Sequence, residues 1–251
     1  MPRRSKPLAQ ATSNSAAASG AAETAGAADS DANADPDGVA LTVTLASEYA
    51  WRGISLSQRK PSLQFDLAFT RALGAGLALE AGAWAYSTSY AEHPDVHVDS
   101  GGYANLTGTT GWNGIGWKLQ AARYVFPQAQ SWNYTELTAA VDHPAAEHPG
   151  AVGFELAYAW APDAFGSGSR GRYVQADAKV RLPRGFDLKL HLGRSLYDRP
   201  ELTYPSFSDM RIAVTKSVAG FDGEIGWIAT SGDHFGRNGA PRWIAAVSRT
   251  F

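Results

Sequence analysis

The stretch that decides the fold is residues 173–192, YVQADAKVRLPRGFDLKLHL, where apolar and polar side chains alternate on both sides of one turn. Over Tyr173–Leu182 and again over Phe186–Leu192, every even-numbered residue is apolar, and Asp177, Lys179 and Asp187 occupy odd positions. A period of two places successive side chains on opposite faces, as in a strand, and does not fit the helical period of 3.6. The stretch therefore predicts two antiparallel strands joined by a tight turn at 183–185.

The same alternation recurs through the chain, which predicts one all-β domain of about twelve strands over 39–251. The expected strands are 39–53, 61–72, 76–87, 96–111, 115–126, 133–142, 151–161, 171–183, 185–196, 207–219, 221–231 and 241–251.

The connections between these strands are of two kinds that alternate along the chain. Glycine-bearing turns stand at 74–75, 113–114, 183–185 and 219–220, with a looser one at 144–150, and longer polar segments stand at 54–60, 88–95, 127–132, 162–170, 197–206 and 232–240. Outer-membrane barrels have short periplasmic turns and long external loops. The pattern therefore predicts a transmembrane antiparallel up-and-down β-barrel with both chain ends in the periplasm.

The composition excludes several other classes of protein. No apolar run reaches the roughly 18 residues of a membrane-spanning helix. The net charge of −2 offers no basic footprint for nucleic acid. The chain has no cysteine, hence no disulfide framework and no thiolate site, and nothing in it calls for a cofactor. Soluble lipocalin-type barrels have eight strands, too few for this chain.

Residues 1–38 form a separate segment rich in Ala, Ser, Gly and Asp, with three basic residues near its start. This low-complexity composition cannot bury a core, so we expect the segment to be disordered. The positive start suits an export signal, but the apolar stretch that should follow is missing. We expect the true start and signal to lie upstream, or the signal to be absent from this sequence.

Charged residues of both signs occupy the face of the strands opposite the apolar one. Because Lys or Arg on the lipid face at the bilayer midplane costs about 2–4 kcal/mol, these residues are expected to line the lumen. Acidic and basic residues are equal in number over 39–251, which predicts little ion selectivity. The candidate lumen residues are Asp66, Glu80, Lys118, Glu136, Glu155, Asp177, Lys179, Arg181, Asp187, Lys189, His191, Arg211 and Glu224, together with Asp222 and Arg242.

The last strand carries a candidate signal for membrane assembly. The chain ends on Phe251, with Trp243 and Val247 on the same strand face. Arg249 lies on that face too, where a long side chain near the rim can reach the headgroups. We expect this strand to be read by the barrel-assembly machinery, with the outer-membrane bilayer as the second partner.

Aromatic residues are expected to form two girdles at the membrane surfaces. Trp51, Trp160 and Trp243 fall at the predicted external strand ends. The predicted periplasmic ends carry Trp112, Trp117, Phe186, Phe221 and Phe251.

Three further groups of residues could form a site but also fit a structural role. His93, Asp95, His97 and Asp99 recur at every second residue, a spacing that suits a divalent metal but fits a polar external loop better, so no metal site is expected. His191 and Ser195 lie about 13 Å apart on an extended strand, too far for Ser–His catalysis. Arg52–Gly53 could anchor the first loop or bind a lipopolysaccharide phosphate, and the architectural role is favoured.

The ordered set of short motifs resembles the TorF-type, Gcw_chp-like family of outer-membrane proteins described as porins. The resemblance covers nearly all of 39–251 and rests on Tyr49–Ser55 with Pro61–Gln64, then Tyr124 with Pro127, Tyr134–Glu136, Ala161–Gly166, Leu182–Phe186, Val214–Ser217 and Val247–Phe251. It implies an outer-membrane barrel and supplies no catalytic residues.

Together these observations predict a bacterial outer-membrane barrel that forms a narrow passive channel for small solutes or ions, and not an enzyme. A barrel with a plugged lumen and a structural or surface-binding role is the main alternative, and an outer-membrane hydrolase ranks below it. Strand number alone does not decide whether the lumen is open, because side chains fill barrels of about eight strands.

Overall fold

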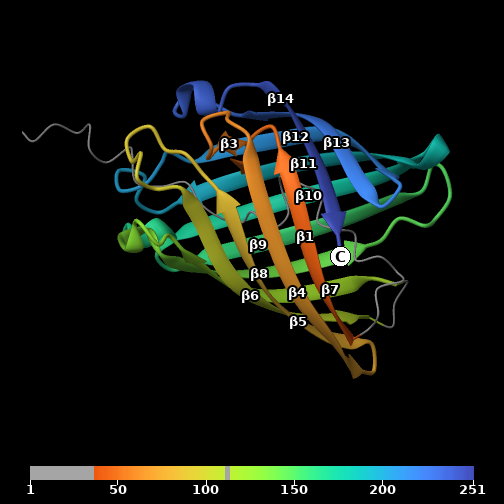
Figure 1. Ribbon diagram of the computed structural model, residues 1–251. Helices are drawn as coiled ribbons and strands as arrows, with labels where there is room; N and C mark the ends of the chain where they lie inside the picture. The colour runs from red at the N-terminus through yellow and green to blue at the C-terminus, as the bar shows by residue number, and fades with distance from the viewer. Residues whose placement is uncertain (1–36, 111–113) are drawn as a thin grey trace, which may run out of the picture.

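The computed structural model describes residues 37–110 and 114–251, which form one closed β-barrel (Figure 1). Twelve strands of this described part build the wall. They are β1 (Asp37–Ala46), β4 (Ser62–Gly74), β5 (Leu77–Ser87), β6 (Val98–Thr109), β7 (Gly116–Val125), β8 (Tyr134–His143), β9 (Val152–Ala161), β10 (Gly171–Leu182), β11 (Phe186–Tyr197), β12 (Phe207–Val218), β13 (Phe221–Thr230) and β14 (Arg242–Thr250).

Each wall strand pairs antiparallel with its neighbours in the chain, and β1 closes the ring by pairing with both β4 and β14. The predicted fold class, an up-and-down barrel of twelve strands, is confirmed. Closure leaves no strand edge unpaired, which is what a sheet needs in lipid, where no water can satisfy backbone groups.

Side chains alternate across the wall as the sequence pattern predicts. Phe154, Val174 and Leu192 are exposed on the outer face, and together with similar residues on the other strands they form the apolar surface of a membrane barrel. No helix among the described residues is long and apolar enough to cross a membrane.

Long loops gather at one end of the barrel and short turns at the other, together with the C-terminus and the start of β1 (Figure 1). The short-turn end is periplasmic by the arrangement of outer-membrane barrels. Trp243 is exposed near the external end, and Phe221 and Phe251 are exposed near the periplasmic end, as expected for girdles. Trp112 lies outside the described residues.

The first predicted strand, 39–53, is wrong beyond Ala46. The wall strand β1 ends there, and the chain turns into the barrel to form a small hairpin from β2 (Ala50–Trp51) and β3 (Ile54–Ser55). Trp51 is therefore not a girdle residue, since its side chain is fully buried. The other predicted strands agree with the structure within about two residues at each end.

The predicted disordered segment, 1–38, lies outside the described residues except for Asp37 and Gly38, which already belong to β1.

Candidate functional site

The lumen and the segment that enters it, Ser47–Lys60, form the candidate functional site. The β2–β3 hairpin turns through Arg52 (φ 45°) and Gly53 (φ 76°). Positive φ at both central residues is the type I′ geometry of two-residue hairpins. A side chain at position 53 would collide with Thr230 and with the backbone oxygen of Ala229, so the close approach to the wall requires glycine.

Arg52 is held deep in the lumen by one carboxylate and two aromatic rings. Its Nη2 donates to both carboxylate oxygens of Glu136 on β8, at 2.9 and 3.1 Å. The guanidinium also lies 4.5 Å from the ring centre of Trp51 and 3.8 Å from that of Tyr173. Both charged side chains are at least 95% buried, so removing either partner would leave the other charge without compensation.

The opposite side of the hairpin is attached to β14. Arg242 donates from Nε to Glu48 Oε1 at 2.6 Å and from Nη1 to the backbone oxygen of Gly53 at 3.0 Å. In the ring order β8 and β14 are six strands apart, so they stand on opposite sides of a twelve-strand barrel. The two ion pairs therefore attach the hairpin to opposite sides of the barrel wall, so that it spans the lumen.

An aromatic core fills the external half of the lumen around this hairpin. Tyr49, Trp51, Ile54 and Leu56 come from the inserted segment, and Phe165 comes from an external loop. The wall contributes its inward-facing residues near the external end, namely Trp84, Tyr86, Tyr124, Tyr134, Tyr197 and Phe207. These side chains are nearly inaccessible to solvent, so the described conformation is closed at its external end.

Beneath the aromatic core lies a hydrogen-bonded network centred on His191 of β11. The His191 ring nitrogens contact Asp177 Oδ1 at 2.7 Å and the Tyr173 hydroxyl at 2.9 Å. The same hydroxyl donates to Asp209 Oδ1 at 2.6 Å. Gly193 leaves room for the hydrogen bond between Tyr173 and Asp209, because a side chain at position 193 would overlap the Tyr173 hydroxyl and the Asp209 carboxylate.

The periplasmic half of the lumen carries accessible charges. Lys118 pairs with Glu155 at 3.4 Å, and each side chain is 31% exposed. Asp187 bridges Lys179 at 3.5 Å and Arg181 at 2.9 Å.

The register places Lys179 directly opposite Lys189. Directly opposite residues of β10 and β11 therefore do not always carry opposite charges. In this part of the wall, Asp187 brings opposite charges together by pairing with both Lys179 and Arg181.

The wall opposite these cations is acidic. Asp66 on β4 accepts a hydrogen bond from Tyr86, and Glu80 on β5 accepts one from Asn105 at 2.9 Å. No Lys or Arg occupies an inward position on β4–β6, three strands that the structure describes in full. In the ring order, β4–β6 stand across the lumen from β10–β12, which carry Lys179, Arg181, Lys189 and Arg211. At inward positions, β4–β6 therefore carry acidic groups and no basic ones, although acidic and basic residues are equal in number over 39–251 as a whole.

The remaining sequence candidates occupy the same inward face. Arg211 and Glu224 form a buried ion pair on β12 and β13. The end of the chain lies on the outer face, where Trp243, Val247 and Phe251 are exposed and the Arg249 guanidinium lies over the rings of Phe221 and Phe251.

The structure separates the residues of the candidate metal site and buries Arg52. Asp99 is buried in the lumen, where it accepts a hydrogen bond from Tyr49, while His93 lies in a loop with its ring against Trp132. No group of three or more His, Asp or Glu side chains within 37–110 and 114–251 could hold a metal ion. Arg52 takes the architectural role, because its burial keeps it from any lipid phosphate.

Sequence reasoning missed the aromatic core, although a signal was present. Trp84 and Tyr86 share the parity of Glu80, which the charge pattern already assigned to the lumen. In the supposed first loop, Ile54 and Leu56 alternate with polar residues as a buried strand would.

With this geometry in view, comparison with known proteins gives one family. The family model described as "Bacterial protein of unknown function (Gcw_chp)" matches residues 30–251. The chain belongs to this family. Among curated proteins, none matches.

Solved structures show which fold the Gcw_chp chain shares. The KdgM porin, described in complex with disordered oligogalacturonate, has a TM-score of 0.51 at 8% identity, covering 85% of this chain and 98% of the porin. The NanC porin gives 0.52 at 10% identity, covering 84% and 98%. An outer-membrane channel of Pseudomonas putida F1 gives 0.51 at 14% identity, covering 87% and 98%. The Gcw_chp chain therefore has the fold of bacterial outer-membrane porins and channels.

Proposed function

We propose that the protein is a passive outer-membrane channel for small solutes, closed at rest by the inserted segment Ser47–Lys60. The observation that carries the proposal is the division of the lumen. An accessible, charge-lined periplasmic half lies beneath a plug made by one short segment of the same chain, which is held by two ion pairs and by packing against the aromatic core. Displacing that segment from the aromatic core would connect the periplasmic half to the external side.

The charged lumen side chains are the proposed lining of the solute path. They comprise the acidic wall, Asp66 and Glu80, the Lys118–Glu155 pair on β7 and β9, and the group on the opposite strands. That group consists of Asp177, Lys179, Arg181, Asp187 and Lys189. Charges of both signs favour small polar or dipolar solutes over a strongly charged one, because low-dielectric walls focus the field of each group. The porin fold of the solved relatives supports the proposal, as does the resemblance to TorF-type porins. No group in this lining requires a catalytic role.

The exposed final strand is the proposed contact with the assembly machinery. Trp243, Val247 and Phe251 are exposed on the outer face of β14, with Arg249 between the last two, at the seam where β14 meets β1. The bilayer is the other proposed partner.

The gating contact can be tested by reversing and restoring one ion pair in the full-length protein. In planar bilayers, we expect wild type to show rare openings and Arg52→Glu to conduct steadily, because two buried carboxylates would then face one another. Combining Arg52→Glu with Glu136→Arg should restore the closed state. Heat-modifiable gel mobility reports whether each variant is folded.

A permanently closed barrel is the second candidate, favoured by the completeness of the aromatic core. It would be supported if the folded Arg52→Glu variant passed no current. A steady wild-type current equal to that of the variant would instead contradict the role of the hairpin as a gate.

A further inference from the structure

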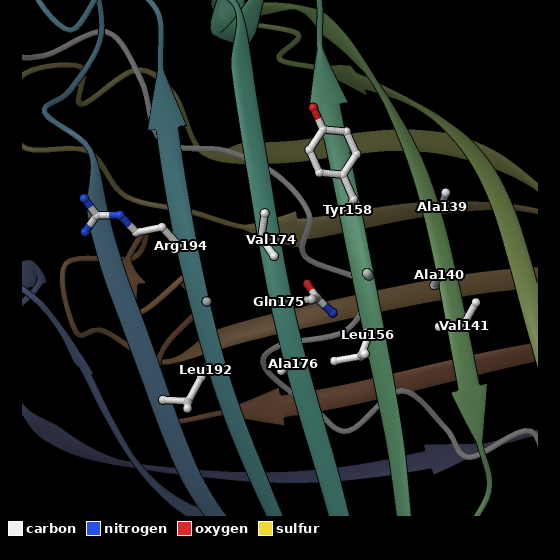
Figure 2. Close-up of a pocket in the computed structure, with 12 residues that line it drawn as sticks. Ala139, Ala140, Val141, Leu156, Tyr158, Val174, Gln175, Ala176, Leu192 and Arg194 are labelled. Atoms are coloured by element: carbon white, nitrogen blue, oxygen red, sulfur yellow. The ribbon is translucent and has the colours of Figure 1, made fainter.

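The outer wall carries a shallow groove that the channel proposal does not use. It spans β8–β11, has a volume of about 540 Å³, and is lined on the lipid side by apolar residues (Figure 2). Arg194 and Tyr158 lie at one end, and Leu156, Ala176 and Leu192 lie toward the other. The strand register sets these residues in two adjacent rows, with Tyr158, Val174 and Arg194 nearer the external end.

Small side chains create the hollow. Ala176 stands between Leu156 and Leu192 in the lower row. The large neighbours project outward and are more than half exposed, whereas the small alanine side chain leaves a gap between them. An apolar hollow facing lipid has no reason to remain empty, because acyl chains fill it without any desolvation cost.

Two arginines stand at the external end of this groove. Arg172 and Arg194 face outward on neighbouring strands at diagonal positions, where side chains lie about 7–8 Å apart at their bases. Arg194 donates to Ser208 at 3.1 Å, and Arg172 pairs with the loop residue Asp198. No outward position on β8–β12, all described in full, carries an acidic side chain. With the loop residue Asp198 counted, Arg172 and Arg194 give the patch a net charge of +1.

We infer that this groove binds a phosphorylated, multiply acylated glycolipid of the outer leaflet, of the lipid A class. The guanidinium groups of Arg172 and Arg194 would bind phosphate, for which their planar donor geometry is suited. One acyl chain lies along Ala176 between the two leucines. The cationic groups face the external side, which is where a lipid with phosphate at the membrane surface presents its charge.

The contrast with the periplasmic end supports a specific role for these arginines. Two outward cations at that end lie over girdle aromatics, Lys216 over Phe186 and Arg249 over Phe221. Within the described part of the chain, neither Arg172 nor Arg194 lies over an aromatic ring, and both stand at the external end of the groove.

Binding can be measured by native mass spectrometry of full-length protein refolded in detergent without lipid and then titrated with purified lipid A. We expect Arg172→Gln with Arg194→Gln to weaken binding about tenfold or more, because two charge-assisted contacts are lost. The matched control is Arg123→Gln, an outward arginine near the external end of β7 that donates to Thr135 and lies outside the groove. It should change affinity by less than roughly twofold.

Two further measurements distinguish the contribution of the apolar groove from that of the arginines. Ala176→Phe keeps both arginines and fills the groove, so it should also weaken lipid A binding. Dephosphorylated lipid A should bind wild type as weakly as lipid A binds the double variant. Equal binding by the double variant and the Arg123 control would overturn the inference. It would also fail if wild type were a dimer that Ala176→Phe dissociates without any effect of lipid, since a second copy would then occupy the groove.

Discussion

The external and periplasmic halves of the lumen are built from the same strands and the same alternation, yet they differ in almost every physical respect. The external half is aromatic, nearly inaccessible to solvent and filled by a hairpin, and it buries charged groups such as the Arg52–Glu136 pair. In the periplasmic half, Lys118, Glu155 and Asp177 remain accessible. The difference teaches that a barrel wall does not decide by itself whether its interior is a core or a channel; the segment inserted into it does.

The largest expected difference is between two variants that each remove one ion pair, one in the external half and one in the periplasmic half. Glu136→Gln leaves the buried Arg52 charge uncompensated, which should favour release of the hairpin by about 3–5 kcal/mol. Glu155→Gln acts on an accessible pair and should cost about 1 kcal/mol or less. Trypsin cleavage after Arg52 in the detergent-solubilised protein measures release directly. Equal cleavage of the two variants would mean that the halves do not differ in their electrostatics.

A smaller effect is expected from removing one hydroxyl at the boundary between the halves. Tyr173→Phe keeps the ring beneath Arg52 but leaves buried Asp209 without its hydroxyl donor and His191 without its contact to that hydroxyl, a loss of about 1–3 kcal/mol. Tyr158→Phe, on the lipid face, is the matched control and should change stability little. Guanidinium unfolding in lipid vesicles, followed by tryptophan fluorescence, compares them. Identical midpoints would show that the network beneath the plug contributes nothing to stability.

The smallest effect concerns the accessible charges. In the conducting Arg52→Glu background, replacing Lys179, Arg181 and Lys189 together by Gln should raise cation preference, because Asp177 and Asp187 lose compensation and the acidic wall of Asp66 and Glu80 is unopposed. The preference should fade as the Debye length falls from about 30 Å at 0.01 M salt to about 3 Å at 1 M. Reversal potentials in asymmetric KCl measure it. An unchanged potential would remove these side chains from the ion path.

By itself, the sequence determined the wall of the barrel. Alternation over a few residues fixes which face of a strand is apolar, and turn length fixes the order of neighbours, so both could be derived from short windows such as 173–192. The charged candidates could be placed on one face for the same reason, since parity is a local property.

Only the tertiary structure decided what fills that wall. The hairpin is held by Arg52 with Glu136, 84 residues away, and by Glu48 with Arg242, 194 residues away. Neither contact can be predicted from a short stretch of sequence, because the two partners are far apart in the chain. Each residue taken alone has the pattern of an ordinary charged residue of the lumen or of a loop. Whether the segment after Ala46 continues the wall or turns inward depends on that closure, and so does the division of the lumen into a core and a channel.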